Sequence, residues 1–178
     1  KLGVPALCHT EPHTYEPLLQ AAKELGPRLV ALRVNHNATV DQIVNIAKEV
    51  KRAGGFVEII TADYFGARQI ETDPEGAFAV LEQSLVDVIS TDYSGTYHDP
   101  ILLLMKKAIE RRVVTLPQAV RLSTSSPAKI VPGLAANKGI IEPGRVADLI
   151  IVDKDDITNV RYVIIAGRVV VEEGRIVV

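Results

Sequence analysis

The feature that most constrains the fold of this chain is a repeated pairing of a short apolar segment with a segment of helical periodicity. Four apolar segments start about 25–30 residues apart, which is the length of one strand plus one helix in a parallel sheet. The segments are continuously apolar rather than alternating, as is typical of strands buried on both faces. The sequence therefore predicts an α/β fold with four parallel strands: Val4–Cys8, Leu29–Val34, Phe56–Thr61 and Leu85–Ser90.

The segments between these strands carry the end signals of helices. Thr39 with Gln42, and Thr115 with Gln118, match capping boxes, in which side chains satisfy the free backbone N–H groups of a helix start. Asp99–Pro100 matches a cap followed by proline at the first helical position. We therefore expect helices in the intervening segments.

After about Val131 the pattern changes to short apolar segments separated by glycine. The Ala-Gly-Arg step between Ile165 and Val169 predicts a hairpin turn. These features predict a small antiparallel β unit, which is too small to bury a core of its own and must pack on something else. Its expected strands are Ala147–Val152, Arg161–Ala166, Arg168–Val170 and Arg175–Val178.

The number of strands limits the architecture. A complete (β/α)8 barrel needs about 250 residues, and four strands cannot close one. We therefore expect residues 1–134 to be the C-terminal half of a TIM-like (β/α)8 barrel. Residues 135–178 would follow as a small antiparallel segment of a composite β-sandwich. An open four-stranded sheet is the alternative, and it would leave two strand edges bare. Because the sequence opens with Lys1 in a strand-like segment, we expect it to begin inside a larger protein.

Composition narrows the expected partners and location. The formal net charge of -2 gives no reason to expect nucleic acid or an anionic membrane as a partner. No apolar run reaches the roughly 18 residues of a membrane span. Cys8 is the single cysteine, so a reducing, cytoplasmic location is the default expectation.

Polar side chains that could carry chemistry follow the four predicted strands. They are His9, His36, Asp63 and Asp92. Active sites of β/α barrels form at the carboxyl ends of the strands, so these residues lie where a site is expected. Two imidazoles and a carboxylate that converge on one edge suit a divalent transition metal, zinc above all. A polar residue at a strand end is also common in turns, so a loop role stays open for each of them.

Asp63 and two further residues are weaker candidates for contact with a substrate. Asp63 is either a substrate contact or a turn residue. Tyr93 and His98 lie in the loop after Asp92 and could touch a substrate, although a plain loop role is equally compatible with their positions.

The most specific motif lies between the last predicted helix and the β unit. It comprises Ser126-Pro127-Ala128, Gly133-Leu134 and the run Gly139–Asp153. This passage is similar to the one that leads from the last barrel helix into the β-sandwich in the amidohydrolase superfamily, the group containing dihydroorotases, deacetylases and imidazolonepropionases. The closing segment Val169–Val178 resembles the usual final hairpin of that superfamily, and the likeness covers essentially the whole chain.

The resemblance implies a function and roles for three residues. In such enzymes the fifth and sixth barrel strands each end in a metal-binding histidine, and the eighth ends in an aspartate; His9, His36 and Asp92 match these positions. Asp92 would also accept the proton of the attacking water and pass it to the leaving nitrogen. The implied activity is hydrolysis of a C–N bond in an amide or cyclic amide of a small molecule, with one or two divalent metal ions, zinc above all.

The chain also departs from the superfamily pattern. The first-strand His-x-His pair and the fourth-strand lysine have no counterpart, so the chain holds at most about half of a binuclear metal site and is expected to be inactive alone. The expected partners are a small-molecule substrate, the missing N-terminal half of the barrel and further copies in a homo-oligomer. Two alternatives stay open: a non-catalytic family member or structural fragment, and a complete open-sheet binding domain.

Overall fold

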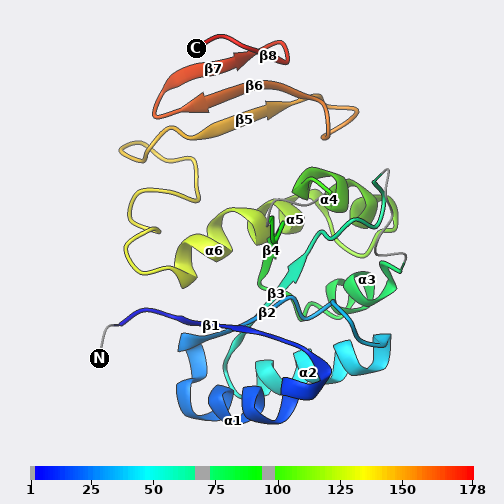
Figure 1. The fold of residues 1–178 in the computed structure, drawn as a ribbon. Coiled ribbons are helices and arrows are strands. Elements are labelled where there is room, and N and C mark those ends of the chain that lie inside the picture. Colours follow the sequence, from blue (N-terminus) through cyan, green and yellow to red (C-terminus); the bar gives the residue numbers. More distant parts are fainter. Residues whose placement is uncertain (1–2, 67–72, 94–98) are drawn as a thin grey trace.

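The structure, a computed structural model, describes residues 3–66, 73–93 and 99–178 of the chain (Figure 1). Its first sheet has four parallel strands in the order β1-β2-β3-β4, which confirms the predicted parallel α/β fold. The strands are β1 (Ala6–His9), β2 (Leu29–Leu32), β3 (Phe56–Ile60) and β4 (Val88–Ser90). Several ends differ from the sequence prediction. The largest differences are that β1 begins only at Ala6, β2 stops two residues earlier, before Arg33, and β4 begins only at Val88. The ends of β1 and β3 each differ by one residue.

Helices follow the strands as the sequence predicts. They are α1 (Tyr15–Leu25), α2 (Val40–Arg52), α3 (Glu75–Glu82), α4 (Ile101–Glu110), α5 (Leu116–Ser123) and α6 (Ser125–Ile130), with short 3₁₀ helices η1 (Pro12–Thr14) and η2 (Gly26–Arg28). The capping boxes of Thr39 with Gln42 and of Thr115 with Gln118 are both confirmed.

The predicted cap of α4 is wrong. Pro100 itself is the N-cap residue of α4, and its extended backbone precedes the first helical residue, Ile101. Asp99 is buried, and its carboxylate accepts a hydrogen bond from the Phe65 N–H at 2.7 Å instead. The side chain is therefore used to hold the loop after β3 and not to cap the helix.

The core lies between the parallel sheet and the helices that cover it. Leu29, Ile59, Ile60 and Leu104 are among its largest fully buried side chains. Each buried side chain of this size contributes about 1.5–3 kcal/mol relative to its exposed state. The continuously apolar strands β2 and β3 are thus buried on both faces. Leu7 on β1, in contrast, is 62% exposed.

The second sheet is antiparallel, in the order β5-β6-β7-β8, as predicted for the β unit. Its strands are β5 (Leu149–Val152), β6 (Val160–Ile165), β7 (Arg168–Glu172) and β8 (Arg175–Ile176). The predicted hairpin is confirmed between β6 and β7, where Ala166 and Gly167 have φ of 48° and 79°. Two successive positive φ values give a turn whose twist matches the strands that it joins.

The antiparallel sheet contacts the helices through the β5–β6 loop. Lys106 of α4 contacts Asp156 at 2.8 Å, and Ile157 packs against the core. Figure 1 shows the sheet set apart from the parallel strands, beyond α4 and α5. Much of its apolar surface is exposed, including Ile150, Ile165 and Ile176.

The parallel sheet is open in this structure. Within the described residues, no further strand pairs with the outer edge of β1 or of β4. None of the described helices is long and apolar enough to cross a membrane.

Candidate functional site

The predicted site residues lie at the carboxyl edge of the parallel sheet. His9 is the last residue of β1 and is in register with Leu32, the last residue of β2. Asp92 lies two residues beyond β4, and His36 lies four residues beyond β2. Because the four strands are parallel, all three residues are at the same edge of the sheet.

The side chain that directly follows β2 is Arg33, a residue that the sequence analysis did not select. Its Nε lies 3.0 Å from Oδ2 of Asp92, and the two side chains are 21% and 29% exposed. The ion pair joins the end of β2 to the end of β4. In the sequence, the signal for Arg33 is its position directly after Leu32. Thr10 has the corresponding position after His9 on the neighbouring strand.

Glu58 of β3 lies beneath this ion pair and was also missed. It is only 5% exposed, and it accepts hydrogen bonds from the Arg33 N–H at 2.6 Å and from the Ser90 hydroxyl. Burial raises the pKa of the Glu58 carboxyl, although the two hydrogen bonds and the Arg33 charge oppose the rise. The sequence signal for Glu58 was that it is the single carboxyl group in the otherwise apolar run Phe56–Ile60.

His36 lies one turn away from the strand end. The backbone N–H of His36 donates to the Arg33 carbonyl at 3.0 Å, which closes a tight turn. The buried side chain of Asn35 fixes this turn to β3, because its Nδ2 donates to the Ile60 carbonyl and its Oδ1 accepts from the Ile60 N–H, both at 2.9 Å. The Asn35 Nδ2 also contacts the Tyr64 hydroxyl at 2.9 Å.

The backbone at this edge is left-handed in three successive strand–helix loops. Arg33, Ala62 and Asp92 have φ of 60°, 47° and 52°. For residues other than glycine this conformation costs about 1–2 kcal/mol each, and such costs concentrate at functional positions. The strain therefore marks the ends of β2, β3 and β4 as a candidate site.

The weaker candidates differ in their surroundings. Asp63 is buried, with its carboxylate close to Gly66, so its position favours the turn role over contact with a substrate. Tyr93 is strongly exposed beside Asp92, and its contact with a substrate stays a prediction. His98 lies outside the described residues. Cys8 is half-buried and packs against the core as a small apolar residue.

These residues supply suitable donor groups for a metal ion but do not form a complete metal site. Imidazole and carboxylate donors are the types that zinc takes, so the chemistry of His9, His36 and Asp92 suits it. Across residues 3–66, 73–93 and 99–178, however, no three His, Cys, Asp or Glu side chains lie close enough together to hold a metal ion. As they lie, the three predicted ligands do not form a metal site by themselves, and their joint role stays a prediction.

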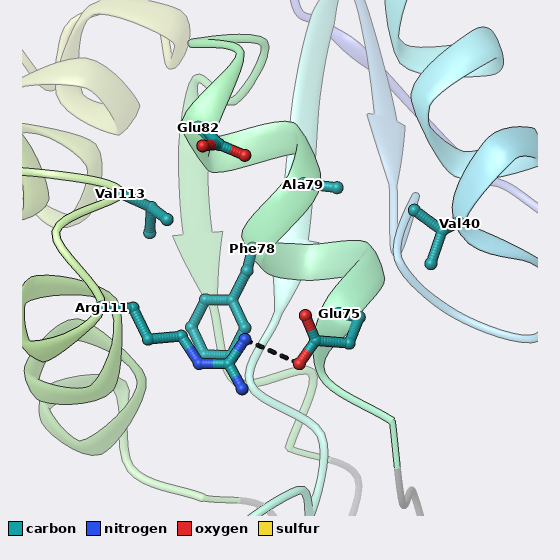
Figure 2. A pocket seen from close by; sticks show the side chains of 7 residues that line it. All are labelled: Val40, Glu75, Phe78, Ala79, Glu82, Arg111 and Val113. Carbon is teal, nitrogen blue, oxygen red and sulfur yellow. Dashed lines mark ion pairs between the residues drawn. The ribbon is translucent and has the colours of Figure 1, made fainter.

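A hollow between the outer helices is separate from this edge. Figure 2 shows Arg111 lying against Phe78, 4.2 Å from the ring centre, and reaching Glu75 at 2.6 Å. Val40, Ala79, Glu82 and Val113 complete its lining. None of the predicted site residues lines the hollow, and two of its charged groups, Arg111 and Glu75, already pair with each other.

Comparison with solved structures shows which proteins share the fold of this chain. The chain superposes on a β-aspartyl dipeptidase from Fervidobacterium islandicum AW-1 with a TM-score of 0.77 and 20% identity, over 98% of this chain and 47% of that chain. A D-hydantoinase gives a TM-score of 0.64 at 17% identity, over 93% of this chain and 50% of that chain. A zinc-bound adenosine deaminase from Xanthomonas campestris gives 0.60 at 17%, over 97% and 46%. The chain thus spans about half the length of these proteins.

The sequence itself identifies the family. Residues 70–170 match the model of the amidohydrolase family, and the chain belongs to that family. This confirms the resemblance seen in the sequence. No curated protein gives a significant match to the chain.

Proposed function

We propose that this chain is the C-terminal half of a metal-dependent hydrolase that cleaves a C–N bond in an amide or cyclic amide of a small molecule. Family membership supports hydrolysis, and a structural neighbour is a β-aspartyl dipeptidase in complex with β-Asp-Leu dipeptide. The observation that carries the proposal is Asp92, a partly exposed carboxylate with a left-handed backbone just beyond β4, at the edge that also bears His9.

The proposed roles follow from the donor groups. Asp92 would accept a proton from the attacking water and return it to the leaving nitrogen. His9 and His36 would offer imidazole nitrogens to a divalent metal, most suitably zinc, together with Asp92. When bound, the metal would polarise the carbonyl group that is attacked. Tyr93 and His98, with Asp63 less favoured by its burial, are proposed contacts to the substrate.

The remaining ligands are proposed to come from an N-terminal half of a (β/α)8 barrel. Residues 1–134 would form the other half, and residues 135–178 would belong to a composite β-sandwich. The open edges of β1 and β4 and the exposed apolar surface of the antiparallel sheet support this arrangement. We further propose a cytoplasmic location, because the lone Cys8 suits a reducing compartment. We also propose that the protein forms a homo-oligomer.

The test uses the protein at its full natural length, assayed for hydrolysis of isoaspartyl dipeptides, cyclic ureides and N-acyl amino acids. We expect Asp92→Asn to lower kcat by about 10²–10⁴-fold, the usual contribution of a positioned proton-transfer group. Asp41→Asn, which alters an exposed aspartate in the first turn of α2, is the matched control and should leave kcat unchanged. Equal activity of Asp92→Asn and wild type would reject the role.

One observation favours a second candidate, a non-catalytic family member. The Asp92 carboxylate already has a cationic partner in Arg33. A full-length protein that binds no zinc, and hydrolyses none of the three substrate classes, would establish this second candidate.

A further inference from the structure

The side chain that β2 presents to Asp92 is Arg33 and not His36. Leu32 ends β2 in register with His9, and Arg33 follows directly. His36 is separated from the strand end by the turn that its own N–H closes on the Arg33 carbonyl. The residue that the sheet geometry brings to the carboxylate is therefore a permanent cation and not a metal ligand.

Arg33 is held in this position by its backbone. Its N–H donates to Glu58 at 2.6 Å, and its φ of 60° turns the chain sharply as β2 ends. The turn behind it is tied to β3 by the buried Asn35. The backbone of Arg33 is therefore held at the end of β2 by contacts that do not involve the ion pair itself.

Arg33 lies between two acidic groups. It pairs with Asp92 at 3.0 Å, and its charge also acts on the buried Glu58. The Arg33–Asp92 pair is less exposed than surface pairs such as Arg52–Glu49, whose side chains are 72% and 45% exposed. Screening by solvent is correspondingly weaker, so the guanidinium strongly offsets the negative charge at this edge.

We propose that Arg33 is a built-in cation that competes with a divalent metal for Asp92. A carboxylate oxygen that ligates zinc lies about 2.0–2.2 Å from the ion. With a guanidinium nitrogen 3.0 Å from Oδ2 of the same carboxylate, the metal and Arg33 repel each other, so a metal at Asp92 has to share the carboxylate with the arginine or displace it. This inference rests on the proposed function, which identifies the edge that binds the metal. The competition with Arg33 sets the metal affinity of that edge.

The test is zinc titration by calorimetry of the metal-free protein at its full natural length. We expect Arg33→Met, which removes the charge but keeps the length of the side chain, to bind zinc about tenfold more tightly or better, because one positive charge no longer opposes the ion. Arg33→Lys keeps the charge and should retain the wild-type affinity. Arg52→Met, which removes the cation of an exposed ion pair on α2, is the matched control and should also bind as wild type does.

A double variant identifies the carboxylate involved. Adding Asp92→Asn to Arg33→Met should abolish the gain in zinc affinity, because the gain comes from the released carboxylate. An unchanged affinity in Arg33→Met, or a gain that persists without Asp92, would overturn the proposal. Arg33→Gln, a second uncharged replacement, must show the same gain, and it decides the outcome if Arg33→Met does not fold.

A measurement in the wild-type background needs no change at Arg33. Asp92→Asn alone should weaken zinc binding by less than about tenfold, because Arg33 already competes for this carboxylate. A loss of several hundredfold would show that the metal holds Asp92 unopposed, and would overturn the inference. These readouts are affinities and not rates of hydrolysis. The competition can therefore be observed in a protein that lacks the proposed activity, and the activity can be observed in a protein without the competition.

Discussion

Glu58 is a single carboxyl group on a strand whose other side chains are apolar. It is buried beneath the Arg33–Asp92 pair, and burial raises its pKa. The negative charge of Asp92 raises that pKa further, whereas the hydrogen bonds from Ser90 and Arg33 lower it. The charge state of Glu58 therefore affects the stability of the whole edge.

The raised pKa of Glu58 gives a defined pH dependence. The folded protein keeps this proton to a higher pH than the unfolded chain does, so the free energy of unfolding falls as pH rises from the ordinary glutamate pKa through the raised pKa of Glu58. We expect Glu58→Gln to lose this component and to gain stability relative to wild type as pH rises through that range. Urea unfolding between about pH 4 and pH 8 measures the difference.

The control for this prediction is Glu16→Gln, which alters an exposed glutamate in the first turn of α1. Its stability relative to wild type should vary much less with pH. A difference between Glu58→Gln and wild type that is constant over the pH range would contradict the assignment.

Single residues at the site could be predicted from the sequence only where the strand end was located correctly. The ends of β1 and β4 were predicted to within one residue, so His9, the last residue of β1, and Asp92, two residues beyond β4, were both selected. Arg33 was missed because the predicted second strand continued to Val34, which placed Arg33 inside the strand and drew attention to His36 in the loop after it. The strand stops at Leu32 because Arg33 adopts a left-handed backbone and donates its N–H to Glu58. Both causes are tertiary, so local sequence pattern could not reveal them.

At the scale of elements, the turn between β2 and α2 depends on Asn35. Its side chain both donates to and accepts from the backbone of Ile60, and it is buried. We expect Asn35→Ala to lower the free energy of unfolding by about 2–4 kcal/mol, because buried backbone groups of β3 lose their partners. Chemical denaturation measures the loss. Asn45→Ala, at an exposed position of α2, is the matched control and should change stability little.

Elements were predicted well where the signal was local. The capping boxes fixed the starts of α2 and α5, and the Ala166–Gly167 step fixed the β6–β7 hairpin. The start of α4 was placed wrongly because Asp99 has a tertiary partner, the Phe65 N–H, which competes with the cap. A capping signal is therefore dependable only when no loop nearby needs the same side chain.

At the scale of the whole molecule, the exposed apolar surface of the antiparallel sheet and the open edge of β1 lead to a test of the half-barrel proposal. Ile176 is 78% exposed, and Leu7 of β1 is 62% exposed. We expect the 178-residue chain alone to self-associate with increasing concentration and to bind a dye for apolar surfaces, because such surfaces and bare strand edges favour association. Light scattering and dye fluorescence measure both effects.

The same measurements address the alternative of a complete binding domain. The protein at its full natural length should bind less dye per chain than the 178-residue chain does. A 178-residue chain that stays monomeric and binds no dye would contradict the half-barrel proposal and would favour an open-sheet binding domain.

The Arg33–Asp92 pair has a mechanical consequence. It connects β2 and β4, which are not neighbours but lie on either side of β3. In a flat sheet, next-nearest strands are about 9–10 Å apart. The long side chain of Arg33 spans this separation and reaches Asp92 at 3.0 Å. The two opposite charges thus link the ends of β2 and β4 across β3, in addition to the backbone hydrogen bonds of the sheet.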